Sequence, residues 1–357
     1  MLQFEEAIRM RKKFNSNPLV AGLALFGLFL AGCGASQDSN ATDESAAGGG
    51  NEDTCDIASD YPNGPVEVIV GYPAGGGTDS VGRLIADGLS EALDTPVNVV
   101  NRDGGGGVVG AEAMANAEAD GHTLGILGSD VILSHWMGHT DITLDSYTSV
   151  GQVNRDGSGL LVAADSEWET ADELLADIEQ NPGQLKGSGV GQGGIWHVGM
   201  LDMLQASGLE ADDVTWVPSE GAAPAMQQLV AGGVDFTTNS LGEAKSQLDG
   251  EQVRALAVSS GEREGDFPEV PTFEEATGST ATTGVRRGLG GPAGIDEDIV
   301  AELSCHLEGI VESGEFTETM QNLGLGIEYL DGSDFADGLA ADDERLGELL
   351  GEAGLLP

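Results

Sequence analysis

The sequence predicts an α/β protein of two lobes, and three observations support that prediction. Short strand-like runs alternate with helical patterns, which favours largely parallel sheets flanked by helices. The segment from residue 61 to residue 357 is too long for one small hydrophobic core and fits two lobes. The helical patterns follow glycine-rich or polar loops, which gather in open α/β sheets at the carboxyl ends of the strands, where ligands bind.

The N-terminal residues predict a secreted, lipid-anchored protein. Four basic residues between Arg9 and Lys13 precede the apolar run LVAGLALFGLFLAG, as in a secretory signal peptide. The run is shorter than the roughly 20 residues of a membrane-spanning helix. The sequence Leu30-Ala31-Gly32-Cys33 resembles the lipobox of bacterial lipoproteins. We therefore expect a signal peptide at 1–32 and lipidation of Cys33 on the outer face of the cell membrane, at the cell surface or in the periplasm. An ordinary signal peptide with a chance cysteine is the alternative.

Residues 33–60 are small, polar and acidic, and contain too little apolar surface to fold alone. We interpret them as the lipidated cysteine followed by a flexible tether. If Cys33 carries lipid, Cys55 and Cys305 remain, and outside the cytoplasm two thiols can pair. We expect a disulfide between them, with two free cysteines as the alternative, because the sequence supplies no geometry.

The net charge bears on the choice of partners. The chain carries 61 acidic residues against 14 Lys and Arg, and loss of residues 1–32 would change its formal net charge from −47 to −49. Such a chain repels nucleic acid and anionic lipid. Because the acidic residues are scattered through every helical pattern, they favour a solvated surface of the kind found in salt-adapted organisms over a single acidic binding patch.

The expected elements follow in chain order from Tyr61. Strand-like runs lie at 66–70, 97–100, 123–127, 159–164, 214–217, 234–238 and 254–259. Helical patterns lie at 79–93, 170–180, 196–208, 223–233 and 295–314. Thr78 or Asp79 could cap the first helix and Thr170 the second, and Gly208 could end the third.

The stretch GYPAGGGTDSVGR, residues 71–83, follows a strand-like run and opens a helix. The N–H groups and the macrodipole at a helix start favour an anion. The stretch lacks the lysine of a Walker loop and the glycine spacing of a dinucleotide fingerprint, which weakens a phosphate site. Two interpretations remain: a binding site for an anion as small as a carboxylate, and a tight turn that needs glycine only for its backbone angles.

A second glycine-rich turn, GSGVGQGGIWHVGM at residues 187–200, also opens a helix and places His197 in its first turn. Two anion-ready helix starts in two lobes indicate a clamp around a ligand. His197 could donate a hydrogen bond to that ligand or could be purely structural.

At this point five segments, in order, resemble those of tripartite tricarboxylate transporter substrate-binding receptors. They begin with YPNGPVEVIVGYPAGGGTDSVGRLIADGLSEAL, VVNRDGGGGVVGAEAMANAEADGHTLGIL and GSGVGQGGIWHVGM, and continue with VPSEGAAPAMQQLVAGGVDF and RALAVSSGEREGDFPEVPTFEEATG. The resemblance covers nearly everything from Tyr61 to about Gly294. It implies a two-lobed periplasmic-binding-protein fold of a type II-like kind, in which each lobe is a mixed, mostly parallel sheet flanked by helices and the ligand lies in the inter-lobe cleft.

The resemblance also implies lobe boundaries and ligand residues. Lobe one would comprise 61–158 with 284–357, and lobe two 159–283. The chain would cross between them near 157–164 and 283–294. We expect the ligand to be bound by Tyr72, Ala74, Gly75, Gly76, Gly77, Thr78, Asp79, Ser129, Ser188, Gly189, Gly191, Gly193, His197, Ser219, Gly221, Asp235 and Asn239. In this family such loops bind carboxylates largely through backbone N–H groups and ordered water.

The function that the resemblance implies is capture of a small organic acid and its delivery to the integral membrane permease of a tripartite tricarboxylate transporter. We expect a monomer that is not an enzyme and needs no cofactor or metal. One departure concerns Ser219 and Glu220, where the family often has an aromatic and a basic residue. A carboxylate there would repel an anionic ligand unless it points to solvent. Monocarboxylates, aromatic acids, and neutral or zwitterionic ligands therefore stay open.

A secreted hydrolase or transferase is the alternative from another functional class. It would use Ser129 or Ser188 with His135, His139 or His197, but no GxSxG elbow is present. His135 and His139 are four residues apart without the glutamate of a zincin helix, so a metal site there is a lesser alternative.

Overall fold

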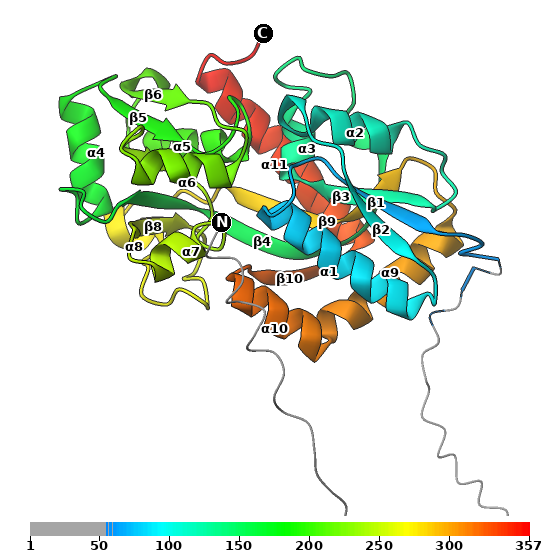
Figure 1. Ribbon diagram of the computed structural model, residues 1–357. Helices are drawn as coiled ribbons and strands as arrows, with labels where there is room; N and C mark the ends of the chain where they lie inside the picture. The colour runs from blue at the N-terminus through cyan, green and yellow to red at the C-terminus, as the bar shows by residue number, and fades with distance from the viewer. Residues whose placement is uncertain (1–54, 56, 59) are drawn as a thin grey trace, which may run out of the picture. The chain divides into compact units, whose positions relative to one another are not determined.

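The computed structural model describes residues 55, 57–58 and 60–357 (Figure 1). The predicted signal peptide, Cys33 and most of the predicted tether therefore lie outside the described residues. In the part of the chain that is described, none of the helices is both long and apolar enough for a bilayer crossing.

The predicted α/β class is confirmed. The strands are β1 (Val66–Val70), β2 (Val97–Asn101), β3 (Thr123–Gly128), β4 (Tyr147–Ala163), β5 (Leu185–Ser188), β6 (Val214–Val217), β7 (Phe236–Thr237), β8 (Val253–Ser259), β9 (Gly284–Pro292) and β10 (Ile327–Asp331). Parallel pairings join β1 to β2 and β3, and join β5 to β6 and β7. Among the described residues, every antiparallel pairing involves β4 or β9.

The 17-residue strand β4 runs through both parts of the sheet and changes partners near its middle. Up to Gly157 it pairs with β9, and from Ser158 onward it pairs with β8. We call β1, β2, β3, β9, β10 and the first part of β4 the first half-sheet. The second half-sheet is β5, β6, β7, β8 and the rest of β4. The chain passes between the two half-sheets within β4 and again where β9 begins.

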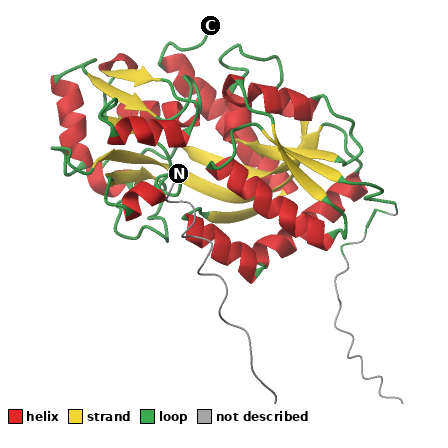
Figure 2. Cartoon of the chain, in the orientation of Figure 1, coloured by secondary structure: helices red, strands yellow, loops and turns green. Residues whose placement is uncertain are grey.

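Helices cover both half-sheets, as Figure 2 shows with helices in red and strands in yellow. They are α1 (Gly77–Ala92), α2 (Val108–Ala115), α3 (Ser129–Leu133), α4 (Ala171–Gln180), α5 (Ile195–Ala206), α6 (Ala222–Val230), α7 (Lys245–Asp249), α8 (Phe273–Thr277), α9 (Glu297–Glu312), α10 (Gly314–Leu323) and α11 (Gly332–Glu352). One buried cluster packs α1 and α9 against β1 and β4, and another packs α4 and α5 against β5 and β8. Burial of these apolar side chains is the main favourable contribution to folding.

Two of the expected helix ends agree with the sequence pattern. Thr170 caps α4 in a capping box with Glu173, each side chain accepting a hydrogen bond from the other residue's backbone N–H. Gly208 follows the end of α5 with φ +75°, the left-handed conformation that glycine adopts without strain.

The C-terminal helix α11 packs against residues from both halves of the fold. Phe335 and Leu339 join a cluster with Ile69 and Leu127 of the first half-sheet. Leu346 and Leu350, further along α11, join the cluster around α5. The helix therefore adds a third connection between the halves, beside β4 and β9.

Near the start of the described residues, a disulfide joins Cys55 to Cys305 of α9, with 5.6 Å between the two Cα atoms. The carboxylate of Glu302 accepts hydrogen bonds from the N–H groups of Ile57 and Ala58 at 3.1 and 2.7 Å. These contacts attach the end of the predicted tether to α9. Cys55 and Cys305 are 250 residues apart, and the chain-entropy account gives a disulfide that closes so long a loop a contribution of up to about 5 kcal/mol to the free energy of unfolding.

Candidate functional site

A cavity of about 160 Å³ is lined by residues from both halves of the fold. Residues 72–78, between β1 and the first turn of α1, and Asp130 of α3 adjoin the first half-sheet. The remaining lining residues adjoin the second half-sheet and are Val190, Trp196, Glu220, Gly221, Ala222, Ala223, Pro224 and Glu243. The volume is below the roughly 300 Å³ at which drug-sized sites begin, so it suits a small solute.

A groove of about 280 Å³ adjoins this cavity. The two share Tyr72, Pro73, Val190, Glu220 and Pro224 in their walls. The groove extends the site toward the glycine-rich loop that precedes α2, and toward Gly191 and Ser219.

The start of α1 forms one wall of the cavity. Gly76 is its N-cap in an extended conformation, and no side chain caps the helix. The first helical hydrogen bond runs from the N–H of Ser80 to the carbonyl of Gly76 at 3.0 Å. The N–H groups of Gly77, Thr78 and Asp79 therefore have no acceptor within the helix, and the macrodipole adds partial positive charge there. This end of α1 can bind an anion such as a carboxylate.

Asp79 lies buried behind the glycine turn and does not line the cavity. Its carboxylate accepts hydrogen bonds from the N–H of Gly75 at 2.9 Å, from Arg83 at 2.8 Å and from Asn101 at 2.8 Å. Burial opposes its charge, but these three hydrogen bonds hold the pKa of Asp79 below its usual value. The predicted cap by Thr78 or Asp79 was wrong, because Asp79 instead fixes the turn that precedes the helix.

Tyr72 closes the cavity toward the glycine-rich loop before α2. Its hydroxyl donates to the carbonyl of Gly106 at 3.0 Å, and Asn101 donates to the Tyr72 carbonyl at 2.9 Å. Gly107 has φ +105°, and a Cβ atom there would lie 2.8 Å from the Tyr72 hydroxyl. Glycine at 107 is thus required both by its backbone angle and by this close approach.

The loop between β5 and α5 forms the opposite wall. The carbonyl of Val190 accepts hydrogen bonds from the Trp216 indole and from the N–H of Ser219, both at 3.2 Å. The N–H of Gly193 donates to Nδ1 of His197 at 2.9 Å, and the His197 ring stacks on Trp216 with 4.5 Å between centroids. His197 therefore holds this loop in shape from behind and does not line the cavity.

Acidification should destabilise the fold through His197. Burial lowers the pKa of His197 from 6.5 to about 4, so the folded protein holds the ring neutral, with Nδ1 as the acceptor. The pKa of His197 is lower in the folded than in the unfolded chain. Its contribution to the free energy of unfolding is therefore fully present above about pH 6.5 and is lost as the pH falls toward 4, by about 3 kcal/mol. His197→Gln keeps an acceptor for Gly193 but cannot titrate.

Urea denaturation at several pH values between 7 and 4 gives the free energy of unfolding at each pH. The effect is the difference between wild type and His197→Gln in how steeply this free energy falls with pH. The exposed His139→Gln serves as the matched control and should follow the wild type. Equal slopes for wild type and His197→Gln would show that His197 does not titrate as its burial requires.

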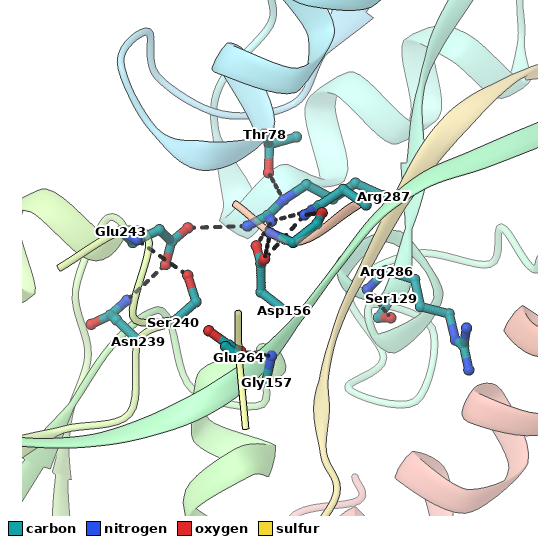
Figure 3. Close-up of polar contacts among 12 residues, drawn as sticks. Thr78, Ser129, Asp156, Gly157, Asn239, Ser240, Glu243, Glu264, Arg286 and Arg287 are labelled. Atoms are coloured by element: carbon teal, nitrogen blue, oxygen red, sulfur yellow. Dashed lines mark hydrogen bonds and ion pairs between the residues drawn. The ribbon is translucent and has the colours of Figure 1, made fainter. Parts of the chain in front are cut away.

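Arg287 of β9 is buried and bonds to two residues of the cavity wall, Thr78 and Glu243, which come from the two halves of the fold (Figure 3). Its guanidinium donates to Thr78 at 3.1 Å, to Asp156 and Asn154 at 2.7 Å each, and to Glu243 at 3.1 Å. Thr78 belongs to α1, whereas Glu243 lies between β7 and α7. This one side chain therefore connects the start of α1 to the second half of the fold.

The charges beneath the cavity are dominated by carboxylates. Burial raises the pKa of Glu243 to about 7, although Arg287 acts in the opposite direction. Burial also raises the pKa of Asp130. Burial opposes the charge of Arg287, but Asp156 and Glu243 outweigh it and keep the pKa of Arg287 above its usual value. The arginine therefore stays charged, while the carboxyl groups of Asp130 and Glu243 are less readily ionised.

The structure brings together only part of the predicted ligand set. Tyr72, Ala74, Gly75, Gly76, Gly77, Thr78 and Gly221 line the cavity, and Gly191 and Ser219 line the groove. Asp79, Ser129, Ser188, Gly189, Gly193, His197, Asp235 and Asn239 line neither. Several of these hold the walls in place: Asp235 accepts from the N–H of Lys186 at 2.7 Å, and Asn239 donates to the Gly189 carbonyl at 3.3 Å.

Sequence reasoning missed Asp130, Trp196, Glu243 and Arg287. Only the arginine left a visible signal, because Arg286 and Arg287 stand together in a chain with 14 basic residues. Asp130 and Glu243 are two of 61 acidic residues, and their approach to the glycine turn depends on the tertiary fold.

A larger cavity of about 670 Å³ lies beside Gly157, where β4 changes partners. None of the predicted ligand residues line it, and several of its charged side chains already have partners. Arg263 pairs with Glu275 at 2.7 Å, and Glu264 accepts from the N–H of Gly157 at 2.9 Å. No helix of eight or more residues among those described begins at its wall. The smaller cavity is therefore the better candidate for an anion.

The residues of the alternative enzyme do not form a catalytic arrangement. The hydroxyl of Ser188 donates to the Val217 carbonyl at 2.8 Å, and that of Ser129 accepts from the N–H of Arg286 at 3.1 Å. His135 lies 3.7 Å from Asp343. Within the described residues, no group of three or more His, Cys, Asp or Glu side chains is placed to hold a metal ion.

Comparison with known proteins relates this chain to a family of receptors. A family model described as "Tripartite tricarboxylate transporter family receptor" matches residues 81–355. The chain is 29% identical over 269 residues to the "UPF0065 protein in tcbD-tcbE intergenic region" of a Pseudomonas species, covering 74% of this chain and 79% of that protein.

Two solved structures are similar to the fold as a whole. A TctC solute binding protein from Polaromonas is 30% identical with a TM-score of 0.66, and the match covers 82% of this chain and 99% of that one. Rpa4515 of R. palustris, solved with adipate, is 26% identical with a TM-score of 0.77, and the match covers 84% of this chain and 100% of that one.

Proposed function

The chain belongs to the tripartite tricarboxylate transporter receptor family, and from that premise we propose that it captures a small organic acid in the cavity between its two half-sheets. The observation that best supports this proposal is that the walls of the cavity come from both halves of the fold. The uncapped start of α1 comes from one half, and residues 220–224 with Glu243 come from the other. A solute held there contacts both halves at once.

The carboxylate of the ligand would be held by the backbone at the start of α1. The N–H groups of Gly77 and Thr78 lack acceptors within the helix, and no atom lies within 4 Å of the ideal Cβ positions of Gly75 and Gly76. The relative from R. palustris was solved with adipate, a carboxylate. This agrees with a carboxylate as the group that α1 recognises.

The two halves would act as lobes that close on the ligand. In this proposal lobe one is 61–158 with 284–357, and lobe two is 159–283. The connections are β4 at Gly157 and the start of β9 at Gly284, which pair with each other. Hinge bending at a few residues of this kind is the usual way in which two-lobed binding proteins close. α11 would bend or slide with them, because it packs against both halves.

Delivery would take place outside the cytoplasm. Signal cleavage before Cys33 and its lipidation would anchor the protein to the outer face of the membrane. The tether would keep the protein within reach of the permease of a tripartite transporter. A monomer with an acidic, salt-adapted surface would suit that setting, because high net charge keeps proteins soluble. We favour a receptor over an enzyme because the family is one of solute-binding receptors.

A melting-temperature screen tests the proposed capture. Small organic acids, amino acids and sugars are each added to the full mature chain. A compound that binds only the folded state, present at about 100 times its Kd, raises the free energy of unfolding by about 2.7 kcal/mol, or the melting temperature by about 5 °C. We expect at least one carboxylate-bearing compound to do so. Shifts with sugars and with no carboxylate would contradict the proposal.

A further inference from the structure

We propose that the ligand carries a cationic group as well as a carboxylate, and that Asp130, Glu220 and Glu243 bind the cation. The ligand class is thus a small zwitterion, such as an amino acid or a betaine. This inference rests on the proposed function, because it assumes that the cavity at the start of α1 is the ligand site.

The charge of the cavity wall is the first observation. Asp130, Glu220 and Glu243 all line the cavity, and among the described residues that line it there is no Lys, Arg or His. The backbone N–H groups at the starts of α1 and α6 attract an anion, whereas every charged side chain in the cavity wall is acidic. A carboxylate therefore suits either helix start, and a cation suits the carboxyl side chains.

Arg287 does not supply the missing positive charge. Its guanidinium is 2.7 Å from Asp156 and 3.1 Å from Glu243, so two carboxylates already surround it. The side chain is only 2% exposed. Counting Asp156, Asp130, Glu220 and Glu243 against Arg287, this part of the molecule carries an excess of negative charge whenever the carboxyl groups are ionised.

Two of the three carboxyl groups are largely shielded from water. The Glu243 side chain is 9% exposed, with one oxygen on Arg287 and the other 3.4 Å from Asn239. Oδ1 of Asp130 is buried and has no hydrogen-bond partner. A buried carboxylate oxygen without a donor is costly, so a rotation of the Asp130 side chain that brings this oxygen to an ammonium group of the ligand would be favourable.

The magnitude of the electrostatic interaction favours a zwitterion over a dianion. Two unit charges about 4 Å apart in a partly buried site interact strongly enough to change an affinity by tenfold or more. Where the cavity carboxyl groups are ionised, a second carboxylate of a ligand would meet repulsion of this order, whereas an ammonium group would meet attraction and would favour their ionised form. Tyr72 and Trp196 also line the cavity, and aromatic faces attract ammonium groups.

Matched ligand pairs isolate the cationic group. Isobutyrate has the shape of alanine with a methyl group in place of the ammonium, and tert-butylacetate has the shape of glycine betaine with carbon in place of nitrogen. Methylsuccinate corresponds to aspartate in the same way. Calorimetry with the mature chain measures the affinity for both members of each pair. At least one zwitterion should bind at least about tenfold more tightly than the matched compound without the cationic group, because the two differ only in that charge.

Variants of the cavity acids should remove this preference. Glu243→Gln and Asp130→Asn are each expected to reduce the zwitterion-to-partner affinity ratio by about fivefold or more, because each removes one carboxylate at nearly constant size. Glu179→Gln, on the exposed face of α4, removes the same charge far from the cavity and should leave the ratio unchanged. If a cavity variant fails to fold, the ligand pairs on the wild type still decide the question.

The outcomes separate this inference from the proposed function. If carboxylates bind and the zwitterions gain nothing over their partners, the inference is wrong and the proposed function stands. If no compound of either kind binds, both are wrong for this cavity. If ethylamine binds as tightly as alanine, the carboxylate is not recognised and the zwitterion inference is overturned. A preference that survives in both Glu243→Gln and Asp130→Asn would also overturn it.

Discussion

Gly76→Val is expected to lose about 100-fold or more in ligand affinity, equivalent to about 2.7 kcal/mol, while the protein stays folded. Gly76 has φ −88° and ψ 175°, an extended conformation open to any residue. A Cβ atom there would meet no other atom within 4 Å. The valine side chain would instead occupy space at the cavity wall and shield the N–H groups of the first turn. Calorimetry with the best ligand of the melting-temperature screen measures the loss.

Gly261→Val is the matched control for this variant. Gly261 also has no atom within 4 Å of its ideal Cβ position, but it lines the larger cavity beside Gly157. The control should keep its affinity. Loss of binding in Gly261→Val but not in Gly76→Val would move the ligand site to the larger cavity.

Arg287→Met should lower the free energy of unfolding by about 3 to 5 kcal/mol. Arg287 is fully enclosed and donates hydrogen bonds to Asp156, Glu243 and Thr78. Removing the arginine leaves two carboxyl groups buried without their counter-charge, and loss of one partner of a buried ion pair is strongly destabilising. Urea denaturation with a two-state fit gives the change from the midpoint and slope.

A second substitution distinguishes the loss of the ion pair from simple loss of packing. Adding Asp156→Asn to Arg287→Met removes one unpaired charge and should recover part of the stability. Arg263→Met serves as the comparison, since its pair with Glu275 is exposed and should contribute less than about 1 kcal/mol. An equal effect of Arg263→Met and Arg287→Met, or no recovery in the double variant, would show that the buried pair has no special role.

Much of the fold follows from local patterns in the sequence. The run VEVIV predicts β1 at the residues where it is found, and the first helical pattern at 79–93 becomes α1 at Gly77–Ala92. The C-terminal part is harder to predict. α11 is rich in glycine and acidic residues, so its apolar face of Phe335, Leu339 and Leu346 stands out only when its packing partners are known. β9 has five glycines or prolines among its nine residues, which argues against a strand until its pairing with β3 and β4 is seen.

The candidate site also has a part that local sequence predicts and a part that depends on the tertiary fold. The glycine turn before α1 is a local feature and can be recognised from residue spacing alone. Glu243 and Arg287 are 44 residues apart and meet only because β9 and the loop after β7 converge on the start of α1. Asp79 and His197 are predicted ligand residues, but neither side chain lines the cavity, and their hydrogen bonds instead hold the walls in place. Sequence spacing cannot tell a wall residue from the residue that holds it.

A carboxylate-bearing ligand is expected to bind at the start of α1, between the two half-sheets. An amide chemical-shift titration of the isotope-labelled mature chain with the best ligand of the screen tests it most directly. The largest chemical-shift changes should belong to Gly76, Gly77 and Thr78 on one wall and to Gly221 and Ala222 on the other. Shifts confined to the residues around Gly157 and Gly261 would contradict it.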